Sequence, residues 1–198
     1  MRQRIRVVVV AAVLLGLAGP ASAAEFVVRP GGDSKVVFTS KAPTESFDGK
    51  TSLMTGTLSL DPGAVGDSIT VHLEVDLASL DTGSKLRNKH MRENHLETDK
   101  FPRAVFDGAT VRSGAGAKLE SGKAAAFQVE GTFSIHGVSR RLVCEAQAML
   151  APKGNAIVFS ASFPITLSDY DIKRPEFLFM KLAETQQVKV SATASSQP

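Results

Sequence analysis

The sequence predicts an all-β fold of about eight or nine antiparallel strands with one short helix. Three observations lead to this class. Apolar and polar residues alternate through most of the chain, turns rich in Gly, Pro, Asn and Asp separate the alternating runs, and one charged stretch at residues 84–96 departs from the pattern. A period of two residues is typical of a strand with one face on a core. Successive strands with short connections favour an antiparallel meander closed into a barrel or a sandwich.

The first 23 residues have the layout of a secretory signal peptide. Three Arg residues precede an apolar run from Val7 to Ala18, and small residues follow at 21–23. The run is shorter than the roughly 20 residues that span a bilayer, and its flanks are those of an exported leader. We therefore expect a signal peptide at residues 1–23, a periplasmic or secreted bacterial protein, a domain at residues 24–194 and a frayed tail at residues 195–198.

Charge and cysteine content exclude some classes of function. The chain has 23 Lys and Arg against 20 Asp and Glu. Three of the Arg residues lie in the predicted leader, which has no acidic residue, so the remaining chain carries 20 of each and a net charge near zero. A nucleic-acid partner is therefore not expected. Cys144 is the only cysteine, so an exported domain has no internal disulfide and depends on its apolar core.

The predicted strands follow one another along the chain. Regular alternation covers residues 54–60, 69–77, 127–135, 142–150, 157–165 and 188–194, and less regular runs cover 26–29, 36–39 and 104–111. Turn residues separate several of these runs, at Asp61-Pro62-Gly63, Ser113–Gly116, His136-Gly137 and Pro152–Asn155. The charged stretch at 84–96 fits a short helix with Ser84 as its N-cap, although its Leu and Met residues form no single apolar stripe.

Small residues are frequent on the apolar faces of these strands. Gly56, Gly131, Cys144, Ala146 and Ala161 stand where a filled core would have Leu or Ile. The interior of an eight-stranded barrel is just wide enough to be filled by side chains or to hold one small ligand. Small inward residues favour a hollow interior, where a long apolar lipid gains roughly 0.8 kcal/mol for each CH₂ group it buries. The alternative is that they relieve crowding in a tapered, filled barrel.

Two motifs suggest other chemistry. The segment Leu80–Ser84 matches an aspartic-protease motif, but that mechanism needs two carboxylates that share a proton, and the chain holds one such motif. Asp81 and Gly83 are therefore expected to form a turn. His90 and His95 lie five residues apart, off a shared helical face and without the partners of a zinc site. We accordingly expect no catalytic residue, no metal site and no covalent cofactor.

Four segments form a recognisable series along the predicted domain: residues 33–38 (DSKVVF), residues 78–106 with their ASLDTG, RNKHMR and KFP motifs, residues 129–140 (VEGTFSIHGVSR) and residues 164–170 (PITLSDY). Together they resemble the YceI-like family of periplasmic lipid-binding proteins. Their order and spacing match from residue 34 to 194, close to the whole predicted domain. The chain departs from the family pattern at Asn88, where Asp is usual, at residues 94–97, which replace an acidic-aromatic stretch, and at Arg141, where Pro is common.

The resemblance implies an extended, lipocalin-like, eight-stranded antiparallel barrel that binds an isoprenoid-type chain, quinone-like or polyprenyl-like, and is not an enzyme. Arg87 and His90 are expected at the polar head group, because a guanidinium can clamp a phosphate or quinone oxygen. The apolar lining is expected to comprise Phe38, Leu58, Val71, Leu73, Val75, Phe106, Val129, Gly131, Phe133, Cys144, Ala146, Phe159, Ala161, Phe163 and Phe179.

Partners and the alternative function follow from the same analysis. The expected partners are an apolar lipid and, transiently, a membrane, while the oligomeric state stays open with a dimer among the alternatives. The alternative function is a non-catalytic, stress-associated interaction protein whose barrel is filled. A barrel that spans the outer membrane is disfavoured, because such barrels carry aromatic girdles and this chain has no Trp.

Overall fold

The computed structural model describes residues 23–42, 46–66, 68–177 and 180–196, so the predicted leader, apart from residue 23, lies outside the described residues. The strands are β1 (Ala24–Val28), β2 (Lys35–Lys41), β3 (Ser46–Thr51), β4 (Met54–Leu60), β5 (Ser68–Asp76), β6 (Arg103–Ser113), β7 (Ala125–Ile135), β8 (Val138–Leu150), β9 (Ala156–Thr166), β10 (Glu176–Phe177), β11 (Met180–Lys181) and β12 (Thr185–Ser196). The helical elements are η1 (Leu77–Ser79), α1 (Lys85–His90), the π-helix η2 (Met91–His95) and η3 (Leu167–Tyr170).

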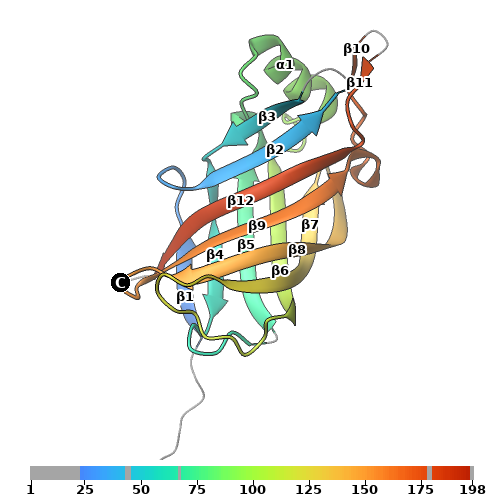
Figure 1. Ribbon diagram of the computed structural model, residues 1–198. Helices are drawn as coiled ribbons and strands as arrows, with labels where there is room; N and C mark the ends of the chain where they lie inside the picture. Colours follow the sequence, from blue (N-terminus) through green and yellow to red (C-terminus); the bar gives the residue numbers. More distant parts are fainter. Residues whose placement is uncertain (1–22, 43–45, 67, 178–179, 197–198) are drawn as a thin grey trace, which may run out of the picture.

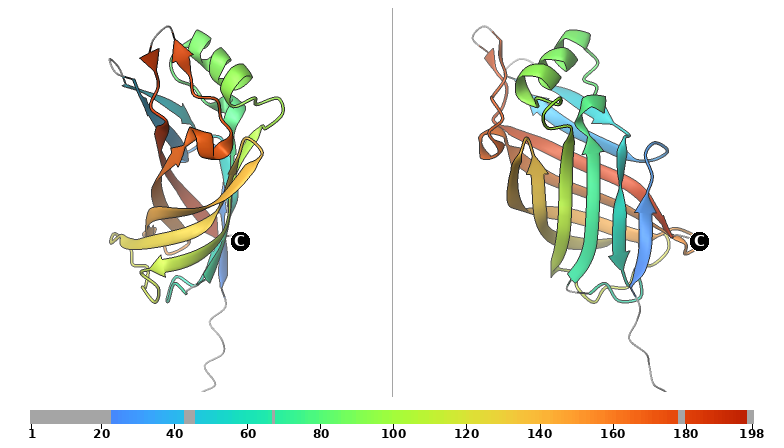
Figure 2. Two further views of the ribbon diagram at one scale, coloured as in Figure 1. Left: turned by 90° about the vertical axis from the view of Figure 1, so that its right-hand side faces the viewer. Right: turned by 180° about the vertical axis from the view of Figure 1, so that it is seen from behind.

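Eight antiparallel strands close into a barrel, which confirms the predicted fold class (Figure 1). Neighbours follow the order β1-β4-β5-β6-β7-β8-β9-β12, and β12 returns to β1 through the pair Val28 and Ala194. The same edge of β12 pairs with β2 over residues 187–191. β3 pairs with β2 in turn, so β2 and β3 extend the wall toward the end of the barrel that carries α1 (Figure 2).

Sequence alternation becomes the inner and outer faces of the wall. On β7, Phe127, Val129 and Phe133 are buried while Gln128 between them is exposed. The buried residues of most strands belong to one continuous apolar cluster. This arrangement explains the dominant pattern of the sequence, because successive side chains of a strand point to opposite faces.

The turn at His136-Gly137 forms the tight hairpin that the sequence predicts. Both residues have positive φ angles, 54° and 77°, and Ile135 pairs with Val138 on either side of them. A two-residue hairpin turn of this type needs positive φ at both central positions, because it then matches the right-handed twist of the strands. The turn therefore sets the register of β7 and β8, two of the longest strands of the barrel.

The predicted helix at residues 84–96 is formed by α1 and η2. The Ser84 side chain caps α1 by accepting a hydrogen bond from the backbone nitrogen of Arg87 at 3.4 Å. Leu86 is 65% exposed whereas Met91 is buried, which explains why no single apolar stripe is visible in the sequence. The helix covers one end of the barrel (Figure 2). None of the helices that the structure describes has the length and apolar character needed to cross a bilayer.

Two local features differ from the prediction. Strand β3 was not predicted, because Asp48 and Gly49 interrupt any alternation. It forms by pairing with β2, and Gly49 leaves room for the ring of Phe38, which a Cβ atom would overlap. The chain end also differs, because β12 continues through Ser196 and pairs with β1. Residues 195–196 are therefore part of the barrel rather than a frayed tail, and residues 197–198 lie outside the described part.

Candidate functional site: an apolar cavity in the barrel

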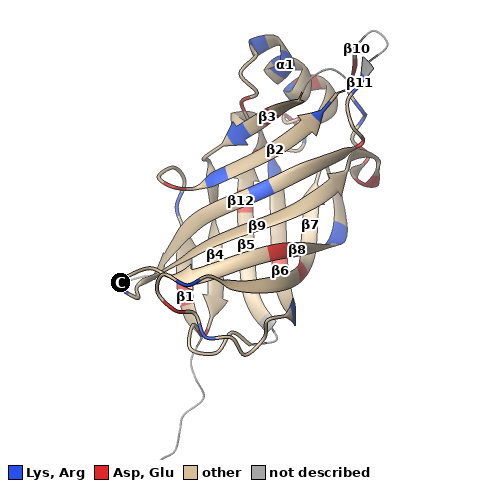
Figure 3. Ribbon diagram, viewed as in Figure 1, with Lys and Arg blue, Asp and Glu red and all other residues tan. Residues whose placement is uncertain are grey.

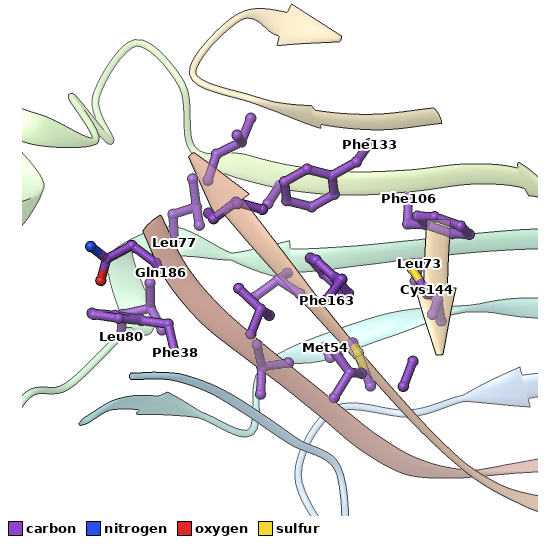
Figure 4. Close-up of a pocket in the computed structure, with 18 of the residues that line it drawn as sticks. Phe38, Met54, Leu73, Leu77, Leu80, Phe106, Phe133, Cys144, Phe163 and Gln186 are labelled. Atoms are coloured by element: carbon purple, nitrogen blue, oxygen red, sulfur yellow. The ribbon is translucent and has the colours of Figure 1, made fainter. Parts of the chain in front are cut away.

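The barrel encloses a cavity of about 760 Å³ (Figure 4). Its walls are formed by side chains of the strands β2 to β9 and β12 and by residues of α1 and η2. Cavities of roughly 300–1,000 Å³ are the size range of small-molecule sites in proteins. The aromatic rings of Phe133, Phe163 and Tyr170 pack near one another, with centroids 5.5 Å apart in each pair that Phe133 makes. The barrel is thus hollow along part of its length.

Two loops close the end of the barrel opposite α1. Val65 and Leu119 are 3% and 1% exposed, and both line the cavity. The loops that carry them hold each other through backbone hydrogen bonds, from the nitrogen of Val65 to the oxygen of Ala117 at 2.9 Å and from the nitrogen of Leu119 to the oxygen of Pro62 at 2.8 Å. Val65 and Leu119 therefore give this end of the cavity a closed apolar floor.

The opposite end of the cavity is bordered by α1, η2 and the segment that leads to β10. Leu86 lines the cavity although it is largely exposed, so it marks the rim of the opening. The His95 Nδ1 atom lies 2.9 Å from the backbone oxygen of Lys173, across this rim. Burial lowers the pKa of His95 below its ordinary value of 6.5, which favours the uncharged ring at neutral pH. Lys85, Arg87 and Lys89 lie on α1 at this end of the barrel (Figure 3).

The structure brings nearly all predicted lining residues around one cavity. Phe38, Leu58, Val71, Leu73, Val75, Phe106, Val129, Phe133, Cys144, Ala146, Phe159, Ala161 and Phe163 all line it. Phe179 lies outside the described residues. That these side chains contact a ligand stays a prediction.

Gly131 has a different role from the predicted one. It is absent from the cavity lining, and a Cβ atom at this position would overlap the backbone oxygen of Gly108 and the ring of Phe106. Its small size is needed because Phe106, which does line the cavity, lies directly against it. Gly131 therefore shapes the cavity indirectly, by letting the Phe106 ring pack against β7.

Arg87 and His90 both lie on α1 and line the opening of the cavity. The guanidinium of Arg87 donates to Thr82 through Nε to Oγ1 and through Nη2 to the backbone oxygen, each at 3.0 Å. It also stacks over the ring of Phe47, 3.9 Å from the centroid. Arg87 is thus held in place by the fold at the opening, and its contact with a head group stays a prediction.

The segment that matches the aspartic-protease motif forms a turn. The Asp81 carboxylate accepts hydrogen bonds from the backbone nitrogen of Gly83 at 2.9 Å and from Asn88 Nδ2 at 2.7 Å. These hydrogen bonds, that of Asn88 first, lower the pKa of Asp81. Asn88 Oδ1 accepts from the nitrogen and the hydroxyl of Thr82. Asn88, where the family usually has Asp, thus ties this turn to α1 without placing a second carboxylate beside Asp81.

Two buried polar residues on the strands of the cavity wall were missed by the sequence analysis. Ser40 on β2 and Gln186 on β12 line the cavity and are 1% and 5% exposed. Both continue an inward series of apolar residues, since Ser40 follows Phe38 and Gln186 precedes Val188 at intervals of two. The phase of the alternation would have identified them as polar residues on the inner face. Within the described residues, no cluster of three or more His, Cys, Asp or Glu side chains could hold a metal ion.

Cys144 offers a chemical probe of the cavity wall. It is 4% exposed, and burial, with a smaller effect from Glu145, raises the pKa of its thiol from 9.0 to about 12. Since the thiolate is the reactive species, we expect iodoacetamide at pH 8 to label the native protein at least about 100-fold more slowly than the urea-unfolded chain. Mass spectrometry of the intact protein measures this ratio, with Cys144→Ser as the unlabelled control. Equal labelling rates would contradict the buried position of Cys144.

The chain is similar in sequence and in fold to known proteins. A family model described as a YceI-like domain matches residues 26–194. A UPF0312 protein of Photorhabdus laumondii is 32% identical over 108 residues, which are 52% of each chain, so the chain spans about half the length of this relative. A UPF0312 protein of Vibrio parahaemolyticus is 27% identical over 81% of this chain and 84% of its own. A polyisoprenoid-binding domain from Saccharophagus degradans has the same fold, with a TM-score of 0.68 at 18% identity over 88% of this chain and 99% of its own.

Proposed function

Because the chain belongs to the YceI-like family, we propose that it is an exported carrier or reservoir for one isoprenoid-type lipid chain, quinone-like or polyprenyl-like, bound inside the barrel. The observation that carries the proposal is the cavity of about 760 Å³, which has an apolar wall and one closed end. Apolar burial alone supplies the affinity, since each CH₂ group contributes roughly 0.8 kcal/mol against the several kcal/mol that association costs.

The Saccharophagus degradans domain supports the choice of ligand class, because it shares the fold and is described as polyisoprenoid-binding. A filled barrel would have no internal cavity, so the cavity of this barrel disfavours the alternative function. Export is supported by the basic and apolar pattern of residues 1–23. The opening under α1, with its basic residues and the exposed Leu86, is suited to transient contact with a membrane from which the lipid is taken.

Native mass spectrometry combined with organic extraction tests the proposal. The full chain is expressed in a bacterial host, and the protein is purified from the exported fraction. We expect a chain that begins near residue 24 and carries a discrete added mass, which solvent releases as an apolar isoprenoid-type compound. Protein at its bare mass, unchanged after incubation with quinones, polyprenols and prenyl phosphates, would overturn the carrier function. The same spectrum gives the oligomeric state.

A further inference from the structure

The cavity wall contains one buried polar pair on neighbouring strands. Gln187 of β12 pairs with Thr39 of β2 in antiparallel register, so Gln186 and Ser40 stand opposite each other one residue beyond that pair. Residues directly opposite each other in an antiparallel pair have Cβ atoms about 4.5–5.5 Å apart. Both side chains are more than nine-tenths buried, and both line the cavity. In Figure 4, every labelled side chain except Gln186 is apolar.

Both residues of this pair have a polar atom without a partner. Within the described part of the chain, neither Ser40 Oγ nor Gln186 Oε1 has a hydrogen bond. The orientation of the amide is fixed, because Gln186 Nε2 donates to the backbone oxygen of Ala183 at 2.6 Å. The opposite orientation would place two acceptor oxygens at that distance. Buried polar atoms in folded proteins are almost always paired, so two unpaired atoms on residues that line one cavity indicate a polar group supplied by the ligand.

The type of group follows from the unpaired atoms. Gln186 Oε1 can only accept a hydrogen bond, whereas the Ser40 hydroxyl can donate or accept. A ligand hydroxyl satisfies both, by donating to Gln186 Oε1 and accepting from the Ser40 hydroxyl. A ketone, ether, ester or fully ionised phosphate has no proton to donate and leaves Gln186 Oε1 unpaired. We propose that Ser40 and Gln186 form a subsite that selects apolar ligands with a terminal hydroxyl, such as a long-chain isoprenoid alcohol or the reduced, hydroquinone form of a quinone.

The place of the pair sets the direction of the ligand. Gln186 lies near the start of β12 and Ser40 near the end of β2. These strand ends are held together by the hydrogen bond from the nitrogen of Ala183 to the oxygen of Lys41. They lie at the end of the barrel that carries α1 (Figure 1). The hydroxyl would therefore sit toward the opening, and the apolar chain would extend toward the floor formed by Val65 and Leu119. This inference rests on the proposed function, because it assigns the polar end of the same ligand.

A matched pair of probes tests the subsite. Geranylgeraniol and its methyl ether share one apolar chain, but in the ether a methyl group replaces the hydroxyl proton. We expect the native protein to bind the alcohol about tenfold more tightly than the ether, measured as Kd by competition in native mass spectrometry. The variant Gln186→Met, which keeps a similar shape without the acceptor, is expected to bring the two Kd values within about twofold.

Two further variants make the test specific. Ser40→Ala is a smaller change that leaves Gln186 in place, and we expect it to reduce the preference for the alcohol without affecting folding. Gln187→Met changes the exposed neighbour on the same strand and should retain the native preference. Equal binding of both probes by the native protein, or an undiminished preference in Gln186→Met, would overturn the subsite. If neither probe binds the native protein, the apolar-ligand function itself fails, which is a separate and recognisable result.

Discussion

Ala146→Phe is expected to weaken the binding of a long isoprenoid alcohol by about two orders of magnitude while leaving the barrel folded. Ala146 lies on β8 between Phe127 of β7 and Ala161 of β9 and lines the cavity. A benzyl group there occupies space that ligand carbon atoms need. Displacing about four CH₂ groups costs roughly 3 kcal/mol of apolar burial, which corresponds to about a hundredfold in Kd. Titration with geranylgeraniol measures the change.

Val143→Phe is the matched control for this substitution. Val143 lies on the same strand, three residues earlier, and is 48% exposed on the outer face. It receives the same aromatic ring without entering the cavity, so we expect the native Kd. Urea unfolding of both variants verifies that the barrel is intact. If Ala146→Phe binds as tightly as Val143→Phe, the ligand does not lie along this part of β8, and the assignment of the cavity as the binding site is wrong.

Gly131→Leu is expected to lower the free energy of unfolding by about 3 kcal/mol. The sequence places Gly131 among small inward residues, which would leave the fold unaffected by a larger side chain. The structure corrects this expectation, because a Cβ atom at residue 131 overlaps the backbone oxygen of Gly108 and the ring of Phe106. A larger side chain at residue 131 must displace both the Gly108 carbonyl, which lies at a bulge of β6, and the ring of Phe106. The midpoint of urea unfolding measures the loss.

A milder pair of substitutions separates this local clash from a general cost of replacing glycine. Gly131→Ala introduces the Cβ atom alone and should still cost about 1–2 kcal/mol. Gly63, like Gly131, does not have a positive φ angle. A Cβ atom at residue 63 would contact the side chain of Asp61 and no backbone atom. Gly63→Ala is therefore expected to change stability by less than about 0.5 kcal/mol. Equal unfolding midpoints for the two alanine variants would show that Gly131 is not sterically required.

Most of the barrel wall could be predicted because its signal is local. The predicted run at 69–77 matches β5 to within one residue at each end. The runs at 127–135, 142–150 and 157–165 lie inside β7, β8 and β9, respectively. Strand β3 was not predicted, because its own sequence shows no alternation. Its place in the wall comes from pairing with β2. The inward residues of the cavity were identified for the same local reason as the strands, whereas the closure of the barrel end by Val65 and Leu119 depends on two loops far apart in sequence.

By itself, the sequence determined most of the side chains that face the interior, several of the turns and the family pattern that the chain follows. Alternation and turn chemistry are properties of a few consecutive residues, so they are visible before folding. Only the tertiary structure showed that Gly131 leaves room for the ring of Phe106 and that Thr82 and Phe47 hold the side chain of Arg87 in place. It also decided that Ser40 and Gln186 share one wall of the cavity. Apart from the short-range contact of Arg87 with Thr82, these relations join residues distant in sequence. The register and closure of the barrel, which no local pattern encodes, bring such residues together.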